Sequence, residues 1–200
     1  IKIIGNLGIK MNIGIIGFGI MGEGLSLYLW CYEHIKKIYI KTGKKKKFDR
    51  NIFLKKLKIN CRFQKKNFIE DMVDKIVLVN DYKEFNKCSV VVESITENLK
   101  SKSELLKDLS ENLNSDIIIS SNTSSLTQKQ LIGSIKYPER FCCIHFFNPL
   151  WNTKYVELII NENFNKKIIE KIFNFLKVIE KEIIYVKDVN GFAVNRILIP

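Results

Sequence analysis

Three closely spaced glycines constrain the fold of this sequence more than any other feature. Gly17, Gly19 and Gly22 follow a short, mostly apolar run at residues 12–17, and a stretch of helical character then continues to about Trp30. A short apolar run that ends in glycine is typical of a strand buried on both faces, and such strands occur in parallel sheets covered by helices. This region therefore predicts the first strand–turn–helix unit of an α/β fold.

Strand-like and helix-like segments alternate along the rest of the chain. The predicted strands cover residues 38–40, 76–79, 90–92, 117–119, 141–146, 155–160 and 183–186, and the predicted helices cover about residues 48–58, 65–75, 104–113 and 166–180. A polar turn of Ser, Asn and Thr at residues 120–125 follows one of the strands. This alternation indicates a mainly parallel sheet flanked by helices.

The glycine spacing matches G-x-G-x-x-G, a pattern that binds dinucleotides when it joins a strand to a helix. In that setting Gly17 permits the tight turn, Gly19 lets the backbone approach a pyrophosphate, and Gly22 allows the helix to pack closely on the strand. The helix N-terminus offers unpaired N–H groups and a partial positive charge to the phosphates. We therefore predict a Rossmann-type fold that binds a nicotinamide dinucleotide, NAD or NADP.

Lys41 departs from the usual dinucleotide pattern. An acidic residue is expected about 20 positions after the glycines, where it accepts a hydrogen bond from a ribose hydroxyl, but Lys41 follows the predicted strand at 38–40. A lysine cannot accept that bond, and its charge favours a 2′-phosphate. Two interpretations stay open: a preference for NADP, or a lysine that faces solvent while NAD binds without this contact.

Net charge gives little further information on partners. Lys and Arg number 33 against 21 Asp and Glu, for a formal charge of +12, which would suit an anionic partner. Lysines spread over many predicted helix faces supply most of it, so compositional drift explains it equally well. Because no basic patch is interleaved with aromatic residues, we predict no nucleic-acid partner.

Cysteine usage and hydropathy exclude several other classes. The five cysteines lack Cys-x-x-Cys pairing and the histidine spacing of a zinc site, so we expect reduced thiols and no metal site. No apolar run reaches the roughly 18 residues of a membrane span, and we predict no membrane association. No targeting segment is visible, so a cytoplasmic location is the default expectation.

A histidine base would have to be His34 or His145, the two histidines of the sequence. His34 lies in a polar connection with no organised partners. His145 ends a strand-like run, and Glu157 lies in the next one among apolar neighbours. A carboxylate in an apolar setting would orient the imidazole and stabilise its protonated form.

Five ordered sequence blocks resemble a known family, the short-chain 3-hydroxyacyl-CoA dehydrogenases, which include 3-hydroxybutyryl-CoA dehydrogenases. The resemblance covers about residues 12–200. Its blocks are GFGIMG at 17–22, VVESITENLK at 91–100, SNTSSL at 121–126, HFFNP at 145–149 and GFAVNR at 191–196.

The resemblance implies a role for each matching residue. His145 matches the catalytic base, and Glu157 matches its acidic partner. The implied reaction moves a hydride between C3 of a 3-hydroxyacyl-CoA and the nicotinamide, while His145 takes or returns the hydroxyl proton. The other matches are polar: Ser124 and Asn195 position the substrate, Asn148 is a further active-site contact on the cofactor side, and Glu97 and Lys102 contact the cofactor.

The resemblance also implies a domain organisation. Residues 12–188 would form the NAD(P)-binding domain that carries the His/Glu pair, and residues 189–200 would begin an all-helical domain for dimerisation and substrate closure. Residues 1–11 would be an extension, because Met11 is a plausible start. We expect a homodimer formed through that helical domain, and we expect residues 1–200 alone to bind a dinucleotide yet turn over poorly.

Two rival interpretations remain. A decayed relative could keep the fold without useful chemistry, which the lysine at position 41 and the lysine drift allow. A related oxidoreductase of the 3-hydroxyisobutyrate or 6-phosphogluconate type would share the glycine turn, but it would use a catalytic lysine and would lack HFFNP with a glutamate twelve residues after the histidine.

Overall fold

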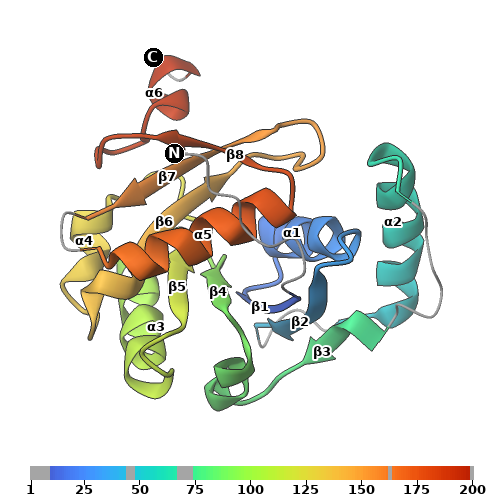
Figure 1. Cartoon of the computed structure of the whole chain (residues 1–200), viewed down its shortest axis with the longest axis horizontal. Helices are drawn as coiled ribbons and strands as arrows, with labels where there is room; N and C mark the ends of the chain where they lie inside the picture. Colours follow the sequence, from blue (N-terminus) through green and yellow to red (C-terminus); the bar gives the residue numbers. More distant parts are fainter. Residues whose placement is uncertain (1–9, 44–47, 67–73, 162–163, 199–200) are drawn as a thin grey trace.

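The computed structural model describes residues 10–43, 48–66, 74–161 and 164–198. Its centre is an eight-stranded sheet in the order β3-β2-β1-β4-β5-β6-β7-β8 (Figure 1). The strands are β1 (Met11–Ile16), β2 (Ile35–Lys41), β3 (Ile76–Leu78), β4 (Val90–Glu93), β5 (Ile118–Ser121), β6 (Phe141–Phe146), β7 (Tyr155–Ile160) and β8 (Glu182–Tyr185). Neighbouring strands run parallel except β6 and β7, which are antiparallel. The predicted mainly parallel α/β fold is confirmed.

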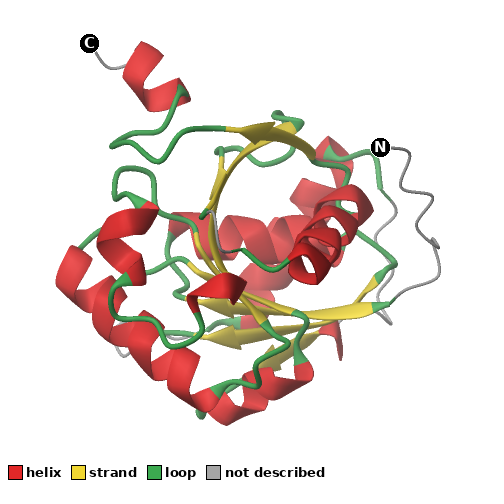
Figure 2. Cartoon of the chain, turned by 60° about the vertical axis from the view of Figure 1, so that its left-hand side comes forward, coloured by secondary structure: helices red, strands yellow, loops and turns green. Residues whose placement is uncertain are grey.

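Helices cover both faces of the sheet (Figures 1 and 2). One face packs against α1 (Ile20–Trp30), α2 (Arg50–Phe63) and α5 (Lys166–Val178). The other packs against α3 (Leu99–Asn112), α4 (Gln128–Ile132) and the short 3₁₀ helix η2 (Tyr82–Lys87). A second 3₁₀ helix, η3 (Pro138–Arg140), precedes β6, and α6 (Val194–Leu198) projects beyond β8 near the C-terminal end (Figure 2).

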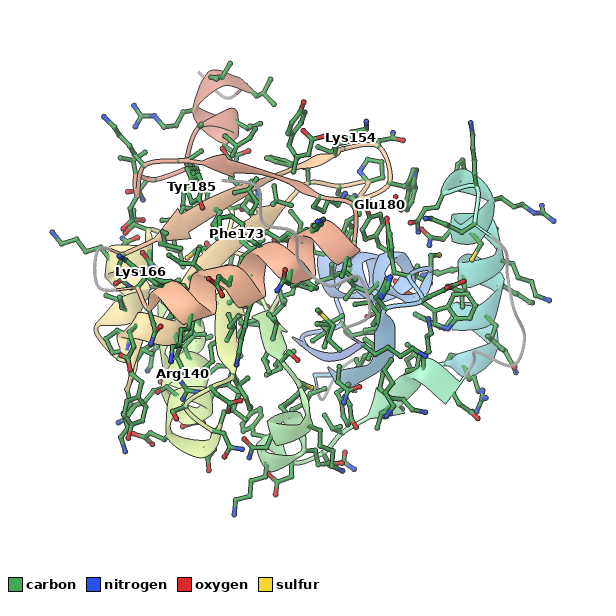
Figure 3. All side chains as sticks on the ribbon, viewed as in Figure 1. Arg140, Lys154, Lys166, Phe173, Glu180 and Tyr185 are labelled. Atoms are coloured by element: carbon green, nitrogen blue, oxygen red, sulfur yellow. The ribbon has the colours of Figure 1, made fainter. Side chains whose placement is uncertain are left out.

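The two layers explain why the central strands carry apolar residues on both faces. In β4, Val90 and Val92 belong to the core under α1, whereas Val91 belongs to the core under α3. Because successive side chains point to opposite faces, a strand covered on both sides needs apolar residues at every position. On the outer strand β8, Tyr185 instead meets Phe173 of α5 edge to face, with ring centroids 6.3 Å apart (Figure 3).

Helix starts differ from the predicted boundaries, because polar caps set them. The helix predicted from residue 104 begins at Leu99, where the Asn98 side chain accepts the N–H of Ser101. The helix predicted at 48–58 runs from Arg50 to Phe63 after the Asp49 cap. The helix predicted at 65–75 falls mostly on residues 67–73, outside the described residues.

One strand end also differs from the prediction. Ser120 and Ser121, expected at the start of a polar turn, are the last residues of β5, and their side chains are buried. The turn therefore begins at Asn122. The sequence pattern missed this because serine is as compatible with a turn as with a strand end.

The strand order defines where a ligand can bind. It runs outward in both directions from the β1/β4 pair, so crossover connections leave that pair to opposite sides. In open α/β sheets the crevice at the carboxyl ends of such a pair is the usual ligand site. Here those ends are Ile16 and Glu93, which are paired in register.

Candidate active site

A cavity of about 1130 Å³ opens at this carboxyl edge of the sheet. Eight of the predicted site residues line it: Gly17, Gly19, Lys41, Glu97, Ser124, His145, Asn148 and Asn195. Three others, Gly22, Lys102 and Glu157, do not line it. The structure thus gathers residues from six separate segments of the chain around one space.

The glycine turn has the shape that a pyrophosphate requires. Gly17 has φ of +95°, and a side chain there or at Gly22 would clash with a backbone carbonyl, that of Ser94 or that of Gly17. A Cβ at Gly19, in contrast, would meet nothing within 4 Å. Gly19 also begins α1 without a side-chain cap, which leaves its first N–H groups for a ligand. The residues present therefore fit a dinucleotide.

Lys41 is the last residue of β2, in the position where an acidic residue was expected. Its Nζ donates to the backbone carbonyl of Asn80 and lies 5.0 Å from the centroid of the Tyr82 ring. Lys41, Thr42 and Tyr82 all line the cavity. The end of the cavity next to the glycine turn therefore carries a cation where NAD-binding proteins usually carry a carboxylate.

His145 and Glu157 face each other across the antiparallel ladder of β6 and β7. The Nδ1 atom of His145 lies 2.7 Å from Oε2 of Glu157. Glu157 is fully buried, and its other oxygen, Oε1, accepts the N–H groups of Ala193 and Val194 at 2.9 Å each. Both oxygens of this buried carboxylate therefore have hydrogen-bond partners, as a buried polar group requires.

Two aromatic rings hold the imidazole of His145. The centroid of Phe147 lies 4.7 Å away and that of Phe192 lies 5.7 Å away, both tilted against the histidine ring. An ionised carboxylate only accepts hydrogen bonds, so Nδ1 carries the proton toward Glu157. This assigns the lone pair of the neutral ring to Nε2, the nitrogen that can exchange a proton with a ligand in the cavity.

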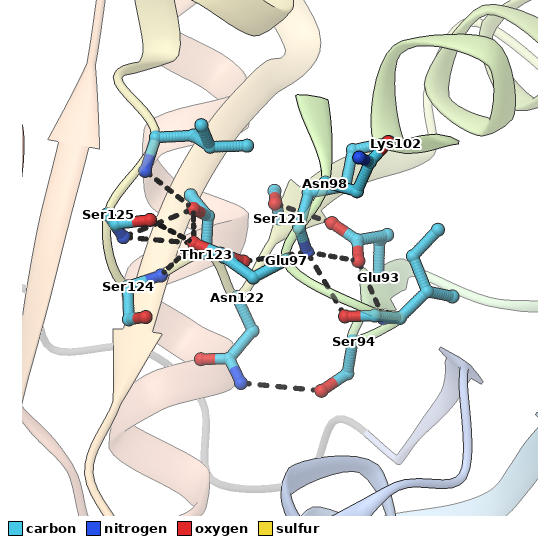
Figure 4. Close-up of polar contacts among 12 residues, drawn as sticks. Glu93, Ser94, Glu97, Asn98, Lys102, Ser121, Asn122, Thr123, Ser124 and Ser125 are labelled. Carbon is cyan, nitrogen blue, oxygen red and sulfur yellow. Dashed lines mark hydrogen bonds and ion pairs between the residues drawn. The ribbon is translucent and has the colours of Figure 1, made fainter. Parts of the chain in front are cut away.

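Glu97 holds the turn that follows β5 (Figure 4). Its Oε1 accepts hydrogen bonds from the hydroxyls of Thr123 and Ser125 and from the N–H groups of Ser124 and Ser125. Burial opposes its ionisation, but these bonds and the charge of Lys102 outweigh burial and lower the pKa of Glu97 to about 2. Glu97 is therefore a charged anchor for the turn.

Lys102 lies next to Glu97 and is paired with a second carboxylate (Figure 4). Its Nζ is 2.6 Å from Oε1 of Glu93 and 3.3 Å from Oε2 of Glu97, and both Lys102 and Glu93 are buried. Glu93 also accepts the Ser121 hydroxyl and the N–H of Ile95. Lys102 does not line the cavity itself but contacts two residues that do, Glu97 and the carbonyl of Ile95, and its predicted contact with a cofactor stays a prediction.

Asn195 connects α6 to the same turn. Its Nδ2 donates to the carbonyl of Ser124 at 2.9 Å, one residue after the Val194 N–H that binds Glu157. On the sheet side, Oδ1 of Asn122 accepts the N–H of Phe146, next to His145. The predicted substrate-positioning residues, Ser124 and Asn195, therefore lie together beside the imidazole.

Several of these contacts were not predicted. Glu93 ends an apolar strand, and a carboxylate at the end of such a strand could have been recognised from the sequence as a candidate site residue. Phe192 and the N–H groups of Ala193 and Val194 gave no usable signal, because an apolar side chain and two backbone groups carry no distinctive pattern. Their role depends on where the chain returns after β8.

Comparison with known proteins places the chain in a family. The model of the family described as "3-hydroxyacyl-CoA dehydrogenase, NAD binding domain" matches residues 12–189. The chain belongs to this family. The resemblance inferred from the five sequence blocks is thereby confirmed, and a dinucleotide cofactor follows from the family of this NAD-binding domain.

Solved structures agree with the assignment to the 3-hydroxyacyl-CoA dehydrogenase family. (S)-3-hydroxybutyryl-CoA dehydrogenase PaaH1 from Ralstonia eutropha has 25% identity and a TM-score of 0.79, over 94% of this chain and 68% of that one. FadB2 of M. tuberculosis has 23% identity and a TM-score of 0.81, over 95% and 68%. The 3-hydroxybutyryl-CoA dehydrogenase of Escherichia coli has 22% identity and a TM-score of 0.76, over 94% and 40%.

The chain therefore spans about two thirds or less of the length of each of these proteins. Within its described residues, no helix is long and apolar enough to cross a membrane.

Proposed function

We propose that the full-length protein interconverts 3-hydroxyacyl-CoA and 3-oxoacyl-CoA by hydride transfer with a nicotinamide dinucleotide. The observation that carries this proposal is the His145–Glu157 pair at the wall of a cavity that the glycine turn also lines. A general base and a dinucleotide turn at one cavity are what an alcohol dehydrogenation needs. Membership of the 3-hydroxyacyl-CoA dehydrogenase family supports the substrate class.

His145 serves as the general acid–base group of the proposed reaction. When bound, the nicotinamide supplies the hydride acceptor or donor for C3. Nε2 of His145 takes the proton of the 3-hydroxyl as the alcohol is oxidised and returns it to the 3-oxo oxygen in the reverse direction. Glu157 offsets the positive charge that the ring gains, and general acid–base action of this kind contributes about 10²–10⁴-fold.

The other polar residues orient the substrate and the cofactor. We assign Ser124 and Asn195 to the substrate, since they lie together and line the cavity with His145. Asn148, two residues after the Phe146 end of β6, lines the same space. Glu97 contributes by holding the Ser124 turn in place.

We further propose that NADP(H) is the preferred cofactor. The support is Lys41, whose ammonium occupies the position of the expected ribose-binding carboxylate and lines the cavity beside Thr42. A cation there attracts a 2′-phosphate. Lys41 also cannot accept a hydrogen bond from a ribose hydroxyl, as a carboxylate in this position would. The predicted homodimer and cytoplasmic location stay predictions.

The direct test follows a deuterium label. The full-length protein is incubated with acetoacetyl-CoA and NADPH or NADH deuterated at C4, and the product is examined by mass spectrometry. The proposal expects 3-hydroxybutyryl-CoA with deuterium at C3. A folded protein that binds the dinucleotide but transfers no label would instead support the decayed relative.

A further inference from the structure

Two thiols from different helices meet on the side of the sheet that α1 and α2 cover. Cys31 ends α1, and Cys61 lies in the last turns of α2, with the two Sγ atoms 3.4 Å apart. A disulfide bond is about 1.4 Å shorter than this separation. The two sulfurs are already in contact, so small side-chain rotations can close the gap.

Two side-chain amides point their N–H groups at the sulfur of Cys31. Its Sγ accepts hydrogen bonds from Nδ2 of Asn60 at 3.4 Å and from Nε2 of Gln64 at 3.3 Å. The same Nδ2 donates to the carbonyl of Leu27 at 2.8 Å, which fixes the orientation of the Asn60 amide. These amide donors favour the thiolate of Cys31, the reactive form of cysteine, but the hydrogen bond shared with Cys61 and burial outweigh them and raise the pKa of Cys31.

This arrangement leaves two polar atoms unsatisfied. Within the described residues, Oδ1 of Asn60 and Oε1 of Gln64 are buried and have no hydrogen-bond partner. Buried polar groups without a partner are rare and ask for an explanation, and a redox-active group is one. In both side-chain amides the oxygen therefore accepts no hydrogen bond, while the N–H group points at Cys31.

The pair differs from the other three cysteines. The hydrogen bond from Cys31 lowers the pKa of the Cys61 thiol, so the two sulfurs titrate as a unit that shares a proton. Burial raises the pKa of Cys88 and of Cys142 to about 12, and it raises that of Cys143 well above its usual value. Cys31 is also the only one of the five that is partly exposed.

We propose that Cys31 and Cys61 are a reversible redox pair that low-molecular-weight disulfides of the glutathione type oxidise to an intramolecular disulfide. The Cys31 thiolate attacks one sulfur of the oxidant, forms a mixed disulfide and releases one thiolate. The Cys61 thiolate then attacks the Cys31 sulfur and releases the second. The pair loses two electrons and two protons, and the oxidant becomes two thiols.

The crosslink would tie α2 to α1 beside the glycine turn. Phe53 of α2 packs near Phe18 of that turn, with ring centroids 6.3 Å apart, and Lys56 of α2 pairs with Glu23 of α1 at 2.8 Å. Closing a loop of about 30 residues restricts the unfolded chain. We expect oxidation to raise the melting temperature by roughly 5–10 °C.

The test uses the full-length protein in glutathione buffers of graded oxidised-to-reduced ratio. Remaining thiols are alkylated, and intact mass and peptide mapping identify the product. The expected result is one disulfide that joins Cys31 to Cys61, that excess dithiol reverses, and that neither Cys31→Ser nor Cys61→Ser forms. The matched control, Cys88→Ser, should form it as the wild type does.

The wild-type map alone can overturn the proposal, whatever the variants do. Full alkylation of Cys31 and Cys61 in the most oxidising buffer would show a packed but inert pair. A mixed disulfide at Cys31 that never resolves onto Cys61 would also contradict it, as would a crosslink through Cys88, Cys142 or Cys143. Because thiol mapping needs no turnover, failure here is distinct from failure of the proposed dehydrogenase activity.

Discussion

His145 and Glu157 are register partners on β6 and β7, and Nδ1 of the histidine lies 2.7 Å from Oε2 of the glutamate. Two strands hold this pair, so no loop movement is needed to bring it together. Oε1 of the same carboxylate binds the backbone at Ala193 and Val194, where α6 begins. The position of α6 and the orientation of the imidazole are therefore coupled through one buried carboxylate.

Replacing this carboxylate should impair chemistry more than binding. In Glu157→Gln the amide can donate to Nδ1, which shifts the ring proton to Nε2 and removes the base. We expect kcat to fall by about 10²–10⁴-fold with acetoacetyl-CoA. The dissociation constant for NADPH should change less than threefold by fluorescence titration. The control is Glu182→Gln at the exposed start of β8; equal losses in both variants would argue against the assigned role.

The glycine turn separates a stability effect from a binding effect. A methyl group at Gly22 would clash with the carbonyl of Gly17, whereas one at Gly19 would meet no atom of the described residues within 4 Å. We expect Gly22→Ala to lower the melting temperature by several degrees. Gly19→Ala should keep the wild-type melting temperature yet weaken dinucleotide binding at least tenfold, because its methyl group would face the pyrophosphate. Unchanged binding by Gly19→Ala would place the pyrophosphate elsewhere.

Lys41 should control the choice between the two dinucleotides. We expect the wild type to have a kcat/KM for NADPH at least tenfold higher than for NADH, and Lys41→Asp to reverse that order. The carboxylate would accept a ribose hydroxyl and repel a 2′-phosphate. Lys37→Asp, on the same strand, is the matched control. A wild type that prefers NADH, with no change in Lys41→Asp, would favour the interpretation that this lysine only faces solvent.

Glu97 should make stability depend on pH in the acid range. Its pKa is about 2 in the folded chain and close to 4.5 without the fold, so its contribution is complete above about pH 5. That contribution is lost as pH falls from about 4.5 to about 2. Because a third of the side chain is exposed, we expect Glu97→Gln to cost about 1–2 kcal/mol at pH 7.

Urea unfolding of Glu97→Gln and wild type at pH 7 and pH 3 measures this dependence. The difference in free energy of unfolding should narrow at the lower pH. A difference that stays constant would mean that the charge of Glu97 contributes nothing to the free energy of unfolding and that only its hydrogen bonds do.

The fold could be predicted well from the sequence because the patterns that indicate strands and helices are local and repeated. Runs such as Val90–Val92 and Phe141–Ile144 are apolar on both faces, as a sheet between two helix layers demands. Helix starts were less predictable, since one cap residue, Asn98, extends α3 by a turn beyond its apolar pattern.

The candidate site was predictable only where side chains carry the chemistry. His145, Glu157 and the glycines stand out by residue type and by the blocks around them. The N–H donors at Ala193 and Val194 do not, because any residue supplies a backbone N–H. The Glu93–Lys102 pair was missed for another reason: burial of two charges is a property of packing between β4 and α3, which residue type alone does not reveal.

The most direct test of the central claim is the rate of hydride transfer in His145→Ala compared with His34→Ala. In the full-length protein, this rate is measured in a single-turnover reduction of acetoacetyl-CoA. The reaction is monitored through the loss of absorbance of the reduced dinucleotide. We predict that His145→Ala slows it by about 10²–10⁴-fold and that His34→Ala leaves it unchanged. A His145→Ala protein that binds both ligands and transfers hydride at the wild-type rate would contradict the assignment of His145 as the catalytic base.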